Sequence, residues 1–329
     1  MAYRVTTEDR GGGKVYTLHD DATGASASIL PAHGFNLFDL RLPVAGQVRP
    51  VLASADDWAD KPQGGAGNGT PILFPYPNRV RGGVYEYHGR RYQLPVTLGP
   101  NAIHGFALDA SWDVIDQKAT ETEASVTGRY QISKDSPKAL PNWPTDAILE
   151  VGYALAGRRL TMTIRVSNPT AEDLPYGFGI HPYFRLPIDP AGDPAATRVI
   201  LPASKYWVLD EFLPTGEVRD VDARLDFRNG QPRRGLKLDD VLTGLSFEQD
   251  RAVCRLVDDN LKAEFRLGFD RGFRELVVYT PPKDGIISLE PYTQTTDAIN
   301  LETRKVDGGL RRLRHGALDT FTITMETVG

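Results

Sequence analysis

Residues 160–166, LTMTIRV, decide the fold class of this chain. Apolar side chains occupy every second position of the stretch, and threonine or arginine stands between them. Successive side chains of a β-strand point to opposite faces, so this alternation predicts a strand with one buried face. An amphipathic helix would instead repeat its apolar residues every three or four positions, and this stretch does not.

Short runs with the same period recur along nearly the whole chain, spaced by roughly 8–15 residues. A tyrosine-rich stretch, residues 84–94, predicts a hairpin whose turn is His88-Gly89. The other candidate strands are residues 15–18, 35–42, 112–115, 124–132, 147–155, 199–201, 205–209, 252–257, 263–267, 276–280, 286–289 and 320–327.

Helical patterns are rare, and the best candidate is residues 53–60, two turns capped by Ser54. The 32 glycines and 24 prolines supply turns between the strands, and the composition does not change along the chain. We therefore predict an all-β protein, a large many-stranded antiparallel β-sandwich, with residues 1–329 as a single domain.

Composition excludes several classes of function. The 43 acidic and 38 basic residues give a net charge of −5, so a nucleic-acid partner is not expected. No run reaches the roughly 18 apolar residues of a membrane span, and the first ten residues lack the apolar core of a signal peptide. Cys254 is the only cysteine, which excludes an intrachain disulfide. We expect a cytoplasmic protein without a membrane partner.

The first candidate for chemistry is His181, inside the aromatic stretch of residues 176–186, YGFGIHPYFRL. An imidazole has an ordinary pKa of about 6.5, so it gives or takes a proton readily near neutral pH. Pro182 cannot donate to a strand ladder, so we expect the strand to end there or to lie at an edge. The competing interpretation is a core histidine satisfied by one hydrogen bond.

Glu290 is the second candidate, because it ends an apolar strand and a proline follows at once. A carboxylate desolvated there would have a raised pKa and would suit a base, although a structural ion pair remains an alternative. No Gly-x-Ser-x-Gly elbow occurs, and no two histidines have metal-ligand spacing. An imidazole and a carboxylate therefore remain, a combination that suits proton transfer, and we expect no metal.

Three further segments carry polar groups in loops. Residues 70–80 contain three prolines and would present Asn78 and Arg79 on a rigid extended segment. Residues 101–106 place His104 beside a glycine, and residues 238–245 carry two adjacent aspartates after Leu238. The alternatives for these segments are a surface arginine, a turn histidine and an exposed acidic turn.

Taken in order, six blocks of this sequence resemble the aldose 1-epimerase (galactose mutarotase) family over most of the chain. The blocks are residues 77–80 (PNRV), 101–105 (NAIHG), 179–184 (GIHPYF), 209–216 (LDEFLPTG), 238–240 (LDD) and 289–292 (LEPY). The resemblance implies a large antiparallel sandwich with an open cleft, and an isomerase that needs neither metal nor cofactor.

Carried over residue by residue, the resemblance makes His181 the general acid at the sugar ring oxygen and Glu290 the general base at the anomeric hydroxyl. The substrate-binding residues that it implies are Asn78, Arg79, His104 and Asp239, with Asp240 as an alternative to Asp239 after a one-residue shift. Phe74, Tyr76 and Trp207 are candidates for stacking on the sugar, and core packing is their alternative.

The expected partner is a small-molecule sugar such as galactose or glucose, bound by a monomer or homodimer. One alternative is a hexose-6-phosphate 1-epimerase, in which Arg81, Arg90 and Arg91 would clamp the phosphate. Another is a sugar-binding module without catalysis, although such a module would have no need of a matched acid and base. We expect free hexoses to be preferred, because a buried phosphate requires paired cations.

Overall fold

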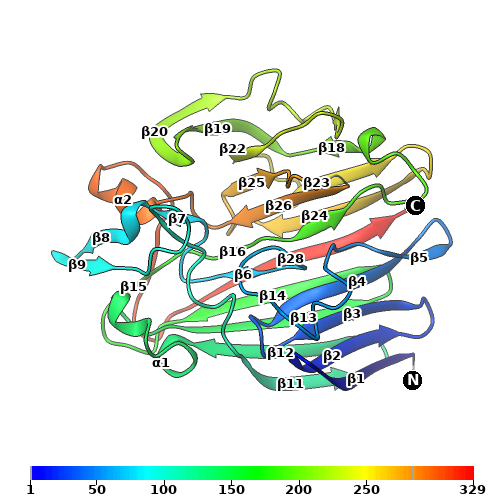
Figure 1. The fold of residues 1–329 in the computed structure, drawn as a ribbon, viewed down its shortest axis with the longest axis horizontal. Helices are drawn as coiled ribbons and strands as arrows, with labels where there is room; N and C mark the ends of the chain where they lie inside the picture. The colour runs from blue at the N-terminus through cyan, green and yellow to red at the C-terminus, as the bar shows by residue number, and fades with distance from the viewer. Residues whose placement is uncertain (1, 284) are drawn as a thin grey trace.

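The computed structural model describes residues 2–283 and 285–329, and antiparallel sheets dominate it (Figure 1). The helices within these residues are short: α1 (Ile132–Asp135), α2 (Ala298–Thr303) and the 3-10 turns η1 (Arg81–Gly83), η2 (Leu140–Asn142) and η3 (Pro194–Ala196). The predicted all-β class is confirmed. None of these helices has the length and apolar character needed to cross a membrane.

The stretch LTMTIRV lies in the middle of the largest sheet, in β14 (Arg159–Ser167). Its apolar residues are buried and its threonines and arginine are not, as the alternation predicts. The sheet runs in the order β11 (Asp113–Ala119), β12 (Ala124–Gln131), β13 (Ile148–Ala156), β14, β28 (Leu318–Val328), β24 (Ala263–Asp270), β23 (Arg251–Asp258), β18 (Arg198–Ile200) and β21 (Gln231–Pro232).

The second large sheet carries the residues of interest for function. Its order is β20 (Leu213–Asp220), β19 (Ala203–Asp210), β22 (Asp239–Leu245), β25 (Glu275–Tyr279), β26 (Ile286–Tyr292), β16 (Gly179–Ile180) and β6 (Ile72–Leu73), and β17 (Tyr183–Arg185) also pairs with β26. As expected, the strand that leads to His181 ends before Pro182.

A third sheet is formed by the N-terminal strands β1 (Tyr3–Arg10), β2 (Gly13–Asp20), β3 (Ala25–Leu30), β4 (Asn36–Val44) and β5 (Gln47–Pro50). Three small pairs complete the strands: β7 (Arg79–Val80) with β10 (Ala102–Ile103), β15 (Leu174–Tyr176) with β27 (Arg311–Leu313), and β8 (Val84–Tyr87) with β9 (Arg90–Gln93). The last pair is the predicted hairpin, and His88 and Gly89 form its turn with φ of 50° and 73°.

Buried apolar side chains from all three large sheets form one continuous core, to which β2 contributes Leu18, β14 contributes Ile164 and β26 contributes Leu289. The sheets therefore pack face to face, as a sandwich requires. That residues 1–329 form a single domain stays a prediction.

The expected helix at residues 53–60 is wrong, because the segment forms turns. Ser54 does not cap a helix; its hydroxyl donates to the Phe38 carbonyl at 2.6 Å. Trp58 and Ala59 are buried in a small cluster with the N-terminal sheet. Tertiary packing of these two side chains thus overrides a weak local helical preference.

Strand register places four polar side chains in one row. Tyr183 of β17 lies opposite Ser288 of β26, Ser288 lies opposite Tyr279 of β25, and Tyr279 lies opposite Asp239 of β22. Directly opposed residues of antiparallel strands share a face. Glu290, two residues beyond Ser288, therefore belongs to the same face of the sheet.

Candidate active site

His181 and Glu290 meet on this face, with 3.2 Å between the imidazole Nε2 and the carboxyl Oε1. They are only 7% and 1% exposed. The backbone N–H of His181 donates to the Pro71 carbonyl at 3.0 Å, and Pro182 ends the local pairing, so the imidazole is held beside β26. The structure thus brings together the two residues that were expected to exchange protons.

Burial changes the proton affinities of both groups. It lowers the pKa of His181 to about 3 and raises the pKa of Glu290 well above its ordinary value. Both shifts have the same cause, because an apolar surrounding disfavours the charged form of each group. The pair therefore holds one proton between the imidazole and the carboxyl group near neutral pH, and neither group titrates as it would in water.

Ser288 determines which imidazole nitrogen takes part. Its Oγ lies 2.9 Å from the Pro182 carbonyl and 2.9 Å from Nδ1 of His181. A carbonyl only accepts, so the serine hydroxyl donates to Pro182 and must accept the Nδ1–H of the imidazole. The remaining nitrogen, Nε2, faces Glu290 and is the one left free to gain or lose a proton.

Two tyrosines complete the surroundings of the pair. The Tyr292 hydroxyl donates to Oε2 of Glu290 and leaves Oε1 to face the imidazole. The Tyr183 hydroxyl donates to the Ala66 carbonyl at 2.7 Å, and its oxygen lies 3.3 Å from Nε2 of His181. That oxygen is thus available as an acceptor for a protonated Nε2. The tyrosine ring also stacks on the imidazole, with 4.6 Å between centroids.

His104 presents a fixed donor beside the pair. Its ring lies 5.6 Å from that of His181, and its Nδ1 accepts the backbone N–H of Asn78 at 3.2 Å. The proton of the neutral ring is therefore on Nε2. Burial, with the charge of the neighbouring Arg79, holds the pKa of His104 well below its ordinary value. Both Asn78 and His104 have positive φ, at 57° and 66°.

Arg79 is a half-buried cation beside these groups. Its Nη1 donates to Oδ1 of Asn78 at 3.0 Å, so the asparagine side chain orients the guanidinium. Burial raises the pKa of Glu290 and of Asp239, and the charge of Arg79 opposes the rise at both carboxyl groups. Arg79 thus acts electrostatically on the site from the β7 segment.

The structure distinguishes the two adjacent aspartates. Both carboxylate oxygens of Asp240 are bound by the guanidinium of Arg224, at 2.9 and 2.7 Å. Asp239 points to the opposite face of β22, in the row of Tyr279 and Ser288. The geometry therefore favours Asp239 over Asp240 as the residue that faces the site.

The candidate stacking rings and the candidate phosphate-binding arginines make contacts within the protein. Phe74, Tyr76 and Trp207 are buried, which leaves core packing as the interpretation of these rings; Tyr76 stacks on Trp143 with centroids 5.6 Å apart. Arg81 Nε faces Asp297 Oδ2 at 3.9 Å, and the Arg90 guanidinium lies over the Tyr92 ring at 5.0 Å. Arg91 pairs opposite Glu86 within the β8–β9 hairpin.

Sequence reasoning missed Ser288, Tyr183 and Tyr292 as members of the site. A partial signal was present, because each lies two residues from His181 or Glu290, the spacing of side chains that share one face of a strand. Of the three, only Ser288 lies within a predicted strand, residues 286–289. The hydrogen-bond partners, by contrast, depend on the way that β17 and β26 pair.

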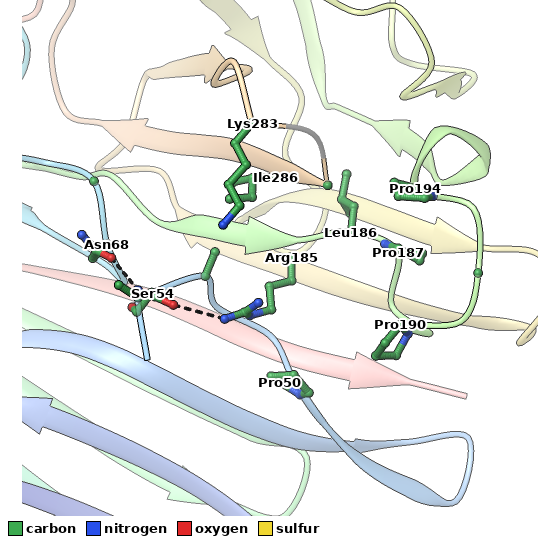
Figure 2. Close-up of a pocket in the computed structure, with 15 residues that line it drawn as sticks. Pro50, Ser54, Asn68, Arg185, Leu186, Pro187, Pro190, Pro194, Lys283 and Ile286 are labelled. Atoms are coloured by element: carbon green, nitrogen blue, oxygen red, sulfur yellow. Dashed lines mark hydrogen bonds between the residues drawn. The ribbon is translucent and has the colours of Figure 1, made fainter. Parts of the chain in front are cut away.

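Two cavities lie among the segments around the pair, although His181 and Glu290 line neither of them. One, of about 650 Å³, lies beyond Arg185 and Ile286 at the end of the β17–β26 pairing, and Figure 2 shows Lys283, Arg185 and Asn68 around it. The other, of about 490 Å³, is lined by Ala66 and His104. Either volume is in the range of small-molecule sites. In the described part of the chain, no set of three His, Cys, Asp or Glu side chains is arranged to hold a metal ion.

Comparison with known proteins is consistent with this geometry. A family model described as Aldose 1-epimerase matches residues 14–326. The uncharacterised protein YihR of Escherichia coli K12 is 29% identical over 172 residues, which are 51% of this chain and 52% of YihR. Human galactose mutarotase is 28% identical over 145 residues, 44% of this chain and 40% of its own. The matches thus span about half or less of these curated relatives.

Solved structures show the same fold. A galactose mutarotase-like protein from Clostridium acetobutylicum superposes with a TM-score of 0.87 at 20% identity, covering 100% of this chain and 99% of the other. A galactose 1-epimerase from Lactobacillus acidophilus gives 0.74 at 19% identity, with 99% and 98% covered. The predicted mutarotase-like sandwich is confirmed.

Proposed function

This chain belongs to the aldose 1-epimerase family, as its sequence resemblance predicts, and we propose that it interconverts the α and β anomers of a free aldose such as galactose or glucose. The observation that carries the proposal is the buried pair of His181 and Glu290, 3.2 Å apart. Such a pair holds one exchangeable proton in a place from which water is largely excluded. Anomer exchange requires a proton donor and a proton acceptor at two oxygens of the same carbon.

In the proposed ring opening, the proton that burial keeps on Glu290 in the free pair first passes to Nε2 of His181. Nε2 then gives this proton to the ring oxygen while Glu290 takes the proton of the anomeric hydroxyl. The bond between C1 and the ring oxygen breaks, and C1 becomes an aldehyde carbon. After rotation about C1–C2, Glu290 returns its proton to the carbonyl oxygen and His181 takes the proton of the attacking hydroxyl. The anomeric oxygen and the ring oxygen are both bonded to C1. Two side chains that lie within hydrogen-bonding distance of each other, such as His181 and Glu290, can therefore each contact one of these oxygens.

The chemistry requires nothing beyond these proton transfers, so the proposal includes no metal or redox cofactor. General acid and base catalysis each contribute typically about 10²–10⁴-fold. Ser288 keeps the Nδ1 proton in place, which leaves Nε2 free to change its protonation state at every step.

The proposed sugar contacts follow from the donor and acceptor pattern. His104 offers an Nε2–H and Arg79 offers guanidinium N–H groups, which suit the ring oxygen and hydroxyls of a sugar. Asp239 offers an acceptor for a hydroxyl proton. Asn78 acts through Arg79, whose guanidinium it orients.

The two alternatives have less support. A phosphorylated substrate would need the cluster of Arg81, Arg90 and Arg91, and these side chains lie against Asp297, Tyr92 and the β8–β9 hairpin. A binding module without catalysis would gain nothing from burying a carboxyl group beside an imidazole, because that burial costs free energy. The isomerase proposal explains the burial.

The test is polarimetry of freshly dissolved α-galactose, α-glucose and glucose 6-phosphate, with wild-type protein and a buffer blank. The proposal expects an accelerated approach to equilibrium rotation for the free sugars. No acceleration for any sugar, from protein with native circular dichroism, would refute it. A clear preference for glucose 6-phosphate would favour the phosphate alternative.

A further inference from the structure

Phe212 is an aromatic residue at an unusual place, the turn of the hairpin between β19 and β20. It is 51% exposed, whereas every other phenylalanine, tyrosine and tryptophan within residues 2–283 and 285–329 is buried or half-buried. A single exposed apolar residue is ordinary on a protein surface, so the meaning of this one depends on what its ring contacts.

The backbone of the turn is also unfavourable for its residues. Glu211 and Phe212 have φ of 48° and 66°, in the left-handed region that residues with a Cβ rarely adopt. The flanking residues hold the turn, since Leu213 is 3% exposed and the guanidinium of Arg304 donates to the Thr215 carbonyl. A fixed, strained conformation that displays a side chain is a recognised feature of ligand sites.

The ring lies over the proposed sugar-binding arginine. The guanidinium carbon of Arg79 is 4.8 Å from the centroid of the Phe212 ring. Arg79 in turn acts electrostatically on Glu290 and Asp239, so Phe212 stands at the outer edge of the same group of residues. Figure 1 shows the β19–β20 turn on the same side of the molecule as α2 and β7.

We propose that Phe212 is a substrate-contacting residue, whose ring packs against the apolar C–H face of the bound aldose while it holds Arg79 in position. The inference rests on the proposed function and adds a residue to its site. An aromatic face is negative, so it attracts both the guanidinium and the weakly positive C–H groups of a sugar. The three aromatic residues considered from the sequence, Phe74, Tyr76 and Trp207, are buried, whereas the ring of Phe212 is exposed.

The test compares three variants with wild type. Phe212→Leu keeps an apolar side chain but removes the aromatic face, and Phe212→Trp keeps that face. Glu211→Gly is the matched control, because it changes the neighbouring positive-φ residue of the same turn and leaves the ring in place. For each protein, KM and kcat for galactose and glucose are measured with the melting temperature.

We expect Phe212→Leu to raise KM about three- to tenfold with kcat nearly unchanged, because the lost contact is made by bound substrate and transition state alike. Phe212→Trp should keep KM within about twofold, and Glu211→Gly should leave KM unchanged. Melting temperatures should stay within about 2 °C of wild type.

An unchanged KM in Phe212→Leu would overturn the proposal, and so would an equal rise in Glu211→Gly, since the turn rather than the ring would then matter. The proposed function fails separately. If the wild type lacks mutarotase activity, titration calorimetry of galactose with the same variants still decides whether the ring contacts sugar. Absence of galactose binding to the wild type as well would refute both.

Discussion

Strands β14 and β26 follow the same two-residue period but serve different ends. In β14, buried apolar residues alternate with threonine and arginine that reach the surface. In β26, every residue after Ile286 is buried, with Ile287 and Leu289 on one face and Ser288 and Glu290 on the other. Both strands therefore have the same alternating sequence pattern, and they differ in whether their polar face is buried. Burial of the polar face of β26 shifts the pKa of Glu290.

The largest contrast is expected between a core substitution in β14 and a site substitution in β26. Ile164→Ala should lower the free energy of unfolding by about 2–5 kcal/mol while folded molecules keep their activity. Glu290→Gln should lower kcat/KM about 10²–10⁴-fold while the fold remains. Denaturant unfolding measures the stability of both variants, and polarimetry measures their kcat/KM. An Ile164→Ala protein as stable as the wild type would contradict the core role given to β14.

Ser288→Ala sharpens the comparison inside β26. Without the hydroxyl, Nδ1 of His181 loses its acceptor. We expect kcat to fall roughly tenfold to hundredfold, the range seen when a metal-bound histidine loses the partner that orients its ring in the same way. Nitrogen NMR of His181 gives a second measurement, since the Nδ1-protonated form should predominate in the wild type and decline in the variant.

Ser246→Ala is the matched control for that experiment. The exposed Ser246 hydroxyl also donates to a proline carbonyl, that of Pro202, but it makes no hydrogen bond to His181. It should leave kcat and the imidazole spectrum unchanged. If Ser288→Ala did the same, Ser288 would have no part in fixing the tautomer.

Asp239→Asn and Asp240→Asn compare two neighbours on opposite faces of β22. Asp239→Asn should raise KM about tenfold, because the hydrogen bond from a sugar hydroxyl loses its charged acceptor. Asp240→Asn loses only its partly exposed pair with Arg224, so stability should change by less than about 1 kcal/mol and KM should not change. A larger KM effect from Asp240→Asn would reverse the assignment.

Much of this account was predictable from the chain itself. The alternation in residues 160–166 predicts the strand that is observed, and the chemistry of His181 and Glu290 predicts an imidazole and a carboxylate at one site, which lie 3.2 Å apart. Both inferences depend on local pattern and side-chain chemistry, which the sequence states directly.

What escaped prediction depends on tertiary contacts. The pairing of Asp240 with Arg224 resolves the choice between the aspartates, and no spacing rule shows it. The turns at residues 53–60 follow from the packing of Trp58, and the left-handed backbone of Phe212 follows from the way its hairpin is held. Register and packing, which join distant parts of the chain, supplied these details.

The pH dependence of kcat/KM for mutarotation tests the central claim most directly. The active pair holds one proton, so activity falls in acid when the pair gains a second proton and in alkali when it loses the first. Burial lowers the pKa of His181 to about 3 and raises that of Glu290. We therefore predict no inflection in kcat/KM near pH 6.5, the ordinary pKa of histidine, after buffer correction, and an inflection there would contradict the shared-proton account.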